Sequence, residues 1–91
     1  MKINGTYVKE LLNKTLVGST ETYDAYVIHG IENFNLKEIY MASVSSYGSS
    51  RRGQFYSTYE EAETESLKIL KEMEESWQEE IKELRQKYQV E

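Results

Sequence analysis

The chain has 91 residues and a net charge of −5, and it contains neither cysteine nor proline. A chain of this length forms one domain, residues 1–91, with a modest core. The absence of cysteine excludes disulfides, a thiol nucleophile and zinc sites of the cysteine type. No apolar run approaches the roughly 18 residues of a membrane span, and no signal-peptide pattern is present. We therefore expect a cytoplasmic protein that does not enter a membrane.

The beginning of the chain predicts a short helix. Residues 1–5 are a polar lead. Residues 6–14 place apolar side chains at i, i+3 and i+4 spacing, with polar residues on the other side, so we expect a helix that ends before Gly18. In an alternative interpretation, residues 15–17 begin an edge strand, because this stretch is short and β-branched.

The middle of the chain is rich in strand-forming residues and turn signals. Residues 23–31 and 36–47 predict two strands joined by a turn at 32–35, where asparagine tolerates left-handed backbone. A loop over 48–53, with glycine at both ends, leads to a third strand at 54–57. Strands joined by such short connections predict an antiparallel meander.

Residues 59–88 predict one long helix, because no glycine or proline interrupts them. Ser57 or Thr58 can cap the free N–H groups at its start. Arg85 and Lys87 near its end have the charge that the helix dipole favours there. The predicted fold is therefore α+β in the order α-β-β-β-α: a short N-terminal helix, a three-stranded antiparallel meander and a long C-terminal amphipathic helix.

One face of the long helix is apolar, and we expect its first half to lie on the sheet. The predicted contact joins Leu67, Leu70 and Met73 on the helix to strand residues such as Val27, Met41 and Phe55. A helix of about 30 residues spans about 45 Å, whereas a domain of this length has a radius of gyration of only about 12 Å. The helix is therefore expected to extend beyond its sheet.

The far half of the helix carries a narrow apolar seam with alternating steps of three and four residues, which is heptad spacing. The seam consists of Trp77, Ile81, Leu84 and Tyr88. Since the sheet is too short to cover these residues, we expect a homodimer or higher oligomer in which the seam meets its symmetry mate. Alternatively, the helix at 6–14 folds back and closes the seam within the monomer.

The opposite helix face is an acidic stripe made of Glu61, Glu65, Glu72, Glu75, Glu79 and Glu83. Residues 60–91 hold eleven Glu against five Lys or Arg, whereas residues 1–59 hold five acidic residues against six basic ones. The stripe is either a solvated helix face or a row of charges that mimics nucleic-acid phosphates in a basic groove. This balance disfavours direct binding of duplex DNA and favours a protein partner with a basic surface.

The predicted loop region 46–56 concentrates positive charge at Arg51 and Arg52. Two guanidinium groups at a hairpin tip can grip a phosphate or a carboxylate. Neighbours that can add hydroxyl donors or stacking are Tyr47, Ser49, Ser50 and Tyr56. We expect both arginines to be exposed and to contribute to binding rather than to folding. The alternative is a turn that is charged only because it meets water.

Nothing in the sequence predicts catalysis. His29 is a lone histidine within a predicted strand, where a structural role is more common than a role as base or ligand. Residues 48–53 lack the pattern of a phosphate-binding glycine loop. We therefore expect no enzymatic activity, no metal site and no cofactor. Eight tyrosines exceed what a small core can bury, so some are expected at the surface, where tyrosine is common in binding sites.

A short, cysteine-free acidic chain with a small sheet and a Glu-rich helix resembles the accessory proteins of bacterial viruses. That group includes small inhibitors of host defence such as anti-CRISPR proteins, and the resemblance is one of type over the whole chain. We expect a non-enzymatic binding protein, a small inhibitor or adaptor that docks on another macromolecule. Two other functions stay open: an oligomeric protein that holds a phosphate-bearing nucleotide at 46–56, and a structural or assembly subunit.

Overall fold

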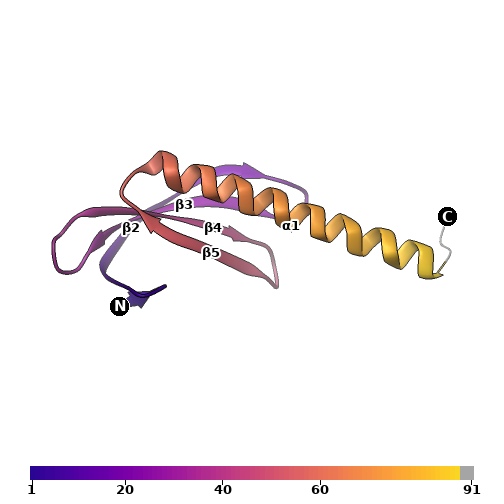
Figure 1. Cartoon of the computed structure of the whole chain (residues 1–91), viewed down its shortest axis with the longest axis horizontal. Coiled ribbons are helices and arrows are strands. Elements are labelled where there is room, and N and C mark those ends of the chain that lie inside the picture. The colour runs from indigo at the N-terminus through magenta and orange to yellow at the C-terminus, as the bar shows by residue number, and fades with distance from the viewer. Residues whose placement is uncertain (89–91) are drawn as a thin grey trace.

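The computed structural model describes residues 1–88 and contains five strands followed by one long helix (Figure 1). These elements are β1 (Lys2–Ile3), β2 (Thr6–Ser19), β3 (Asp24–Glu32), β4 (Glu38–Ser45), β5 (Ser50–Tyr56) and α1 (Tyr59–Tyr88). The strands form one antiparallel sheet in chain order. The predicted α+β class, the antiparallel sheet and the long helix are confirmed. The predicted order α-β-β-β-α is wrong, because the helix follows five strands and no helix precedes them.

The chain begins with a tight hairpin rather than a polar lead. Asn4 and Gly5 connect β1 to β2 with φ angles of 48° and 83°, and Ile3 pairs with Thr6 on either side of them. Two central residues with positive φ make the turn whose twist matches paired strands, and Asn-Gly is its strongest sequence signal. The interpretation of residues 1–5 as a lead is therefore wrong.

Residues 6–14 belong to strand β2, so the predicted helix is wrong. β2 pairs with β3, and three bulges interrupt the register. Each bulge adds one residue to β2, so residues on the same face follow at steps of two or three instead of a constant two. On the face away from α1 they are Val8, Leu11, Lys14 and Leu16. These steps imitate helical i, i+3 spacing, which explains the error. Residues 15–17 are strand, as the alternative interpretation expected, but they lie near the end of β2 and not at its start.

Small residues let α1 approach the middle strands closely. Ala25 and Ala42 on the sheet and Ala62 and Ser66 on the helix are fully or almost fully buried. The Ser66 hydroxyl donates a hydrogen bond of 2.8 Å to the backbone carbonyl of Tyr26 on β3, so the one buried polar group of this contact is satisfied. The core cluster on this face consists of Tyr23, Ala25, Ala42, Val44, Ile69 and Leu70.

The other face of the sheet is buried in part, because the sheet curls into a half-barrel. The Asn4 amide in the first hairpin donates a hydrogen bond of 2.7 Å to the carbonyl of Gly53 on β5, at the opposite edge. Buried side chains on this second face are Val8, Ile28, Ile39 and Met41. Met41 pairs with Phe55 on that face, so the predicted contact of these two residues with the helix is wrong.

The β4–β5 hairpin is tighter than predicted. The Ser46 N–H donates to the Ser49 carbonyl at 2.8 Å, and β5 begins at Ser50 instead of at residue 54. Most of the loop predicted at 48–53 is therefore strand.

The start of α1 is capped as the sequence indicated. The hydroxyl of Thr58 accepts a hydrogen bond from the Glu61 N–H at 3.4 Å and donates one of 2.8 Å to the Glu61 carboxylate. This residue pair at positions N-cap and N3 satisfies one free N–H of the first helical turn. The prediction of a cap at Ser57 or Thr58 is confirmed, with Thr58 as the capping residue.

The far half of α1 extends past the end of the sheet (Figure 1). The molecule measures 57 × 22 × 16 Å, and its radius of gyration is 16.0 Å, against about 12 Å for a compact domain of this length. From Glu75 onward every described helix residue except Ile81 is exposed, so the predicted extension is confirmed. Within residues 1–88, no helix has both the length and the apolar character needed to cross a membrane.

Candidate binding surfaces

The helix and the edge strand β5 meet at a glutamate. The Glu65 carboxylate accepts a hydrogen bond from the Gln54 N–H at 2.9 Å and one from the Tyr56 hydroxyl at 2.8 Å. Gly53 lies directly against this carboxylate, because a Cβ atom at residue 53 would overlap it. A side chain at residue 53 would push the Glu65 carboxylate aside, so the glycine leaves room for the contact that joins β5 to α1.

The side chains of Arg51 and Arg52 lie on opposite faces of β5. Successive residues of a strand point to opposite faces: Arg51, opposite Val44, lies on the α1 side, and Arg52, opposite Ser43, lies on the other. Arg51 forms an exposed ion pair of 3.3 Å with Glu72. Both arginines border a cleft of about 320 Å³, but the carboxylates of Glu65 and Glu72 line it as well. The two side chains thus leave β5 on opposite faces, and the cleft that both border also holds two carboxylates.

The other residues expected to join the arginines are spread from the tip of the β4–β5 hairpin to the end of β5. Tyr47 is fully exposed at the tip of the β4–β5 hairpin and borders a separate hollow with Thr20 and Glu21 of the neighbouring turn. Ser49 and Ser50 are exposed beside it. The Tyr56 hydroxyl donates a hydrogen bond to the Glu65 carboxylate. Tyr47 and Tyr56 thus stand at opposite ends of the segment that holds the arginines.

The bond between Tyr56 and Glu65 predicts a pH dependence. The hydrogen bond to Glu65, then desolvation and the negative charges of Glu65 and Glu61, raise the pKa of Tyr56 above its ordinary value of 10.0. Because the pKa of Tyr56 is higher in the folded than in the unfolded protein, its hydrogen bond contributes fully to stability below a pH of about 10. The contribution disappears as the pH rises through the folded pKa.

Absorbance at 295 nm during an alkaline titration reports tyrosine ionisation. The difference between the wild-type curve and that of Tyr56→Phe should show one tyrosine that ionises later than free tyrosine. Glu65→Gln removes the carboxylate charge and should shift that step towards lower pH. A difference curve centred at or below the ordinary tyrosine pKa would contradict the assigned hydrogen bond.

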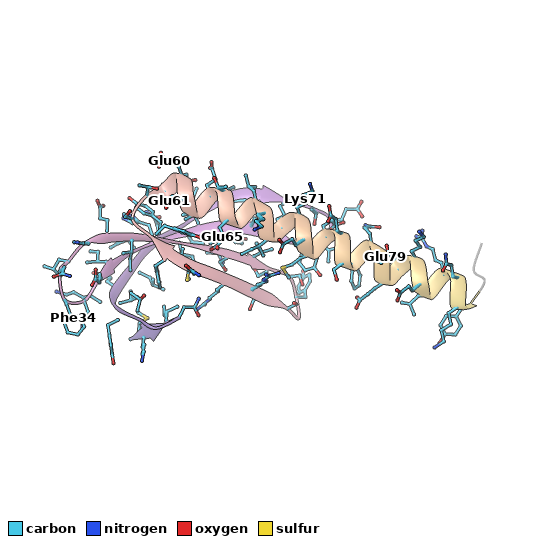
Figure 2. All side chains as sticks on the ribbon, in the orientation of Figure 1. Phe34, Glu60, Glu61, Glu65, Lys71 and Glu79 are labelled. Carbon is cyan, nitrogen blue, oxygen red and sulfur yellow. The ribbon has the colours of Figure 1, made fainter. Side chains whose placement is uncertain are left out.

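The acidic stripe is not a uniform row. Glu65 and Glu72 contact β5 residues, and Glu61 belongs to the helix cap. Figure 2 shows Glu61 and Glu65 over the sheet and Glu79 on the extended half of the helix. The stripe residues that are exposed on that half are Glu75, Glu79 and Glu83. Part of the stripe therefore stabilises the fold, which leaves a short acidic segment at the surface.

The predicted seam lies on the part of α1 beyond the sheet. Leu84 and Tyr88 are 55% and 64% exposed, and Trp77 is 38% exposed. Ile81 is half-buried. The helix expected at 6–14 as a cover does not exist, so none of the described elements closes the seam.

A third surface lies at the opposite end of the molecule and was not predicted. It is the tip formed by Tyr7 of β2 with Phe34 and Leu36 of the β3–β4 turn, called the apolar tip below; Figure 2 shows Phe34 at the end farthest from the helix C-terminus. The rings of Tyr7 and Phe34 meet edge to face at 5.6 Å. Phe34 is 73% and Leu36 is 60% exposed. The available signal was a phenylalanine and a leucine within an otherwise polar turn.

The backbone of this turn departs from expectation in an informative way. The residue in the left-handed region is Leu36, with φ of 56°, and not an asparagine of the turn. The turn is nevertheless held firmly: the Leu36 N–H donates to the Glu32 carbonyl at 3.1 Å, and the Asn33 N–H donates to the Tyr7 carbonyl at 2.9 Å. An unfavourable backbone conformation thus displays an exposed leucine.

His29 has a structural environment. Its ring stacks on Tyr40 with centroids 4.7 Å apart and an interplanar angle of 6°, and its Nε2 lies 3.2 Å from a carboxylate oxygen of Glu38. In the part of the chain that the structure describes, no three side chains of His, Asp or Glu are grouped to hold a metal ion.

Comparison with known proteins adds no relative to this picture. No protein-family model, no curated protein and no solved structure matches the chain.

Proposed function

We propose that the protein is a non-enzymatic docking protein that binds a partner protein through the apolar tip. The observation that carries the proposal is Leu36, which holds a left-handed backbone while its side chain faces solvent. A left-handed conformation costs a residue with a Cβ roughly 1–2 kcal/mol, and asparagine or glycine adopts it more easily. In the isolated molecule the leucine remains 60% exposed, so it gains little burial in return. A partner that covers it supplies the missing stabilisation.

The form of the tip suits docking. Tyr7 and Phe34 support each other edge to face, and two backbone hydrogen bonds hold the turn. A surface that is rigid before binding loses little conformational entropy in the complex. Aromatic side chains are enriched at the centres of protein interfaces. The tip therefore has the composition of an interface anchor.

Within this class, we infer an inhibitor or adaptor. The chain's resemblance in type to small inhibitors from bacterial viruses supports the first role, and its elongated shape with surfaces at both ends supports the second. Binding of a phosphate-bearing nucleotide at 46–56 gains no support, because Arg51 and Arg52 lie on opposite faces of β5 and two glutamates share the cleft.

A photo-crosslinking amino acid tests the docking surface directly. Benzoylphenylalanine in place of Phe34 should give a discrete protein adduct in cells of the source organism, and the adduct should resist nuclease. The same substitution at Tyr47 is the matched control, because Tyr47 is a fully exposed aromatic residue on a different hairpin. Identical adducts from both positions, a nuclease-sensitive adduct, or none at 34 would contradict the proposal.

Leu36→Asn should stabilise the fold and weaken docking together. Asparagine relieves the left-handed strain, so the free energy of unfolding should rise by about 0.5–1 kcal/mol and the melting temperature by a few degrees. The adduct from position 34 should diminish, because the apolar side chain is gone. Leu36→Ala separates the two effects, since it removes the side chain but keeps the strain. A Leu36→Asn protein that crosslinks as well as the parent would show that the leucine is not part of the docking surface.

A further inference from the structure

We infer that the seam of α1 is covered by the seam of a second copy of the chain, with the two helices antiparallel. The inference is independent of the apolar tip, which lies at the other end of the molecule. It starts from the segment of α1 beyond the sheet, residues 75–88, which is about four helical turns long. A helical segment of this length without tertiary packing is marginal in water.

The seam faces the space just past the end of the sheet. At 100° per residue, Trp77 and Leu84 lie within about 20° of Ser66, which is buried against β3. The apolar side of the extended segment is therefore the side that faces the sheet farther back. A second helix can occupy this space in the layer of the sheet, because helices pack at about 8–10 Å, close to the spacing of stacked layers in a domain.

An antiparallel arrangement pairs side chains of matching size. Trp77 then packs on Tyr88 of the second copy, and Ile81 packs on Leu84 of the second copy, with each contact repeated by the two-fold axis. Tyr88 of the second copy lies about one turn past Met73, the last half-buried apolar residue over the sheet. The paired helices therefore cover the seam along the extended segment.

Charge decides between the two possible orientations. Residues 74–81 hold four glutamates and no basic residue, whereas residues 82–88 hold three basic residues and one glutamate. Antiparallel helices place the acidic half of one copy beside the basic half of the other, with Glu80 next to Lys87 on each side. A parallel pair instead places Glu74 against Glu74, at a heptad core position, and crowds both sheets at one end.

The resulting dimer has its two sheets at opposite ends, and each sheet presents its apolar tip outward. The single tryptophan makes the association measurable, because Trp77 lies in the contact. Sedimentation should show a dimer at micromolar concentration, and dilution should shift the Trp77 emission to longer wavelength as the seam meets water. A monomer at 100 µM would overturn the inference.

Substitutions in the seam should separate association from folding. Trp77→Glu should raise the dissociation constant by about a hundredfold or more, since each dimer loses two large apolar contacts and gains two buried charges. Leu84→Glu, farther from the sheet, should act in the same way. Circular dichroism should show both variants still folded. A dimer that survives both changes would place the contact elsewhere and overturn the inference.

A charge exchange tests the orientation. Glu80→Lys should weaken the dimer about tenfold, because two attractive pairs become repulsive. Adding Lys87→Glu should restore it only if residues 80 and 87 are neighbours across the two-fold axis. In a parallel pair Glu80 faces Arg85, so the second change would not rescue the first. Failure of rescue would overturn the antiparallel arrangement.

Cysteine crosslinking gives a second measurement of orientation, aided by the absence of native cysteine. An oxidised mixture of Glu80→Cys and Lys87→Cys proteins should yield disulfide-linked dimers joining residue 80 to residue 87. Each variant oxidised alone should yield few disulfide-linked dimers, because the same residue in the two copies lies at different positions along the helix axis. Efficient linkage of Trp77→Cys to itself would indicate parallel helices and contradict the arrangement.

Discussion

Leu70→Ala is expected to lower the free energy of unfolding by about 2–5 kcal/mol, the range for truncating a leucine in a packed core. Leu70 is 8% exposed and belongs to the cluster in which α1 meets β3 and β4. Its neighbours there include Ala25 and Val44, which come from strands whose backbone is held on both sides. The core around it therefore cannot collapse freely into the space that the missing atoms leave.

Denaturant unfolding followed by far-UV circular dichroism measures this loss, at one fixed protein concentration because association adds to apparent stability. Leu67→Ala is the matched control. It is the same change one turn earlier on the same helix. Leu67 was predicted to be buried against the sheet but is 42% exposed, so its truncation should cost less than about 1 kcal/mol. A loss under about half a kcal/mol for Leu70→Ala would mean that the helix does not pack on the sheet there.

Met41→Ala is expected to cost about 2–5 kcal/mol as well, for a reason that concerns the opposite face of the sheet. Met41 is fully buried although it points away from α1. It is covered because the sheet curls and the first hairpin reaches β5 through Asn4 and Gly53. A flat meander with one face in water would leave this methionine half-exposed, and the substitution would then cost little.

Leu16→Ala is the control for this second face. Leu16 lies on the same side of the sheet as Met41 but is 56% exposed, so its truncation should cost less than about 1 kcal/mol. Equal losses for the two substitutions, or a loss below about 1 kcal/mol for Met41→Ala, would show that the second face is open to solvent.

Two errors of prediction in the N-terminal part had different origins. The turn at Asn4 and Gly5 was readable, since this dipeptide selects a two-residue hairpin by its own backbone preferences. The strand that follows was not readable from periodicity. Its three bulges are defined only by the register against β3, and each one moves the apolar pattern away from the period of two that marks a strand.

The sequence by itself determined α1, from its cap at Thr58 to its extension past the sheet. These features depend on neighbouring residues along the chain: a capping pair three positions apart, no glycine or proline, and a continuous apolar stripe. A helix makes its hydrogen bonds within its own segment, so local sequence suffices to predict it.

Only the tertiary structure decided the sheet and the surfaces that depend on it. The separation of Arg51 from Arg52 follows from where β5 starts its pairing with β4. The burial of Met41 follows from the curl of the sheet. The apolar tip exists because Tyr7 of β2 lies beside the β3–β4 turn. A strand makes its hydrogen bonds with distant segments of the chain. Its register, its curvature and the neighbours of its side chains therefore depend on pairings that no local window of sequence contains.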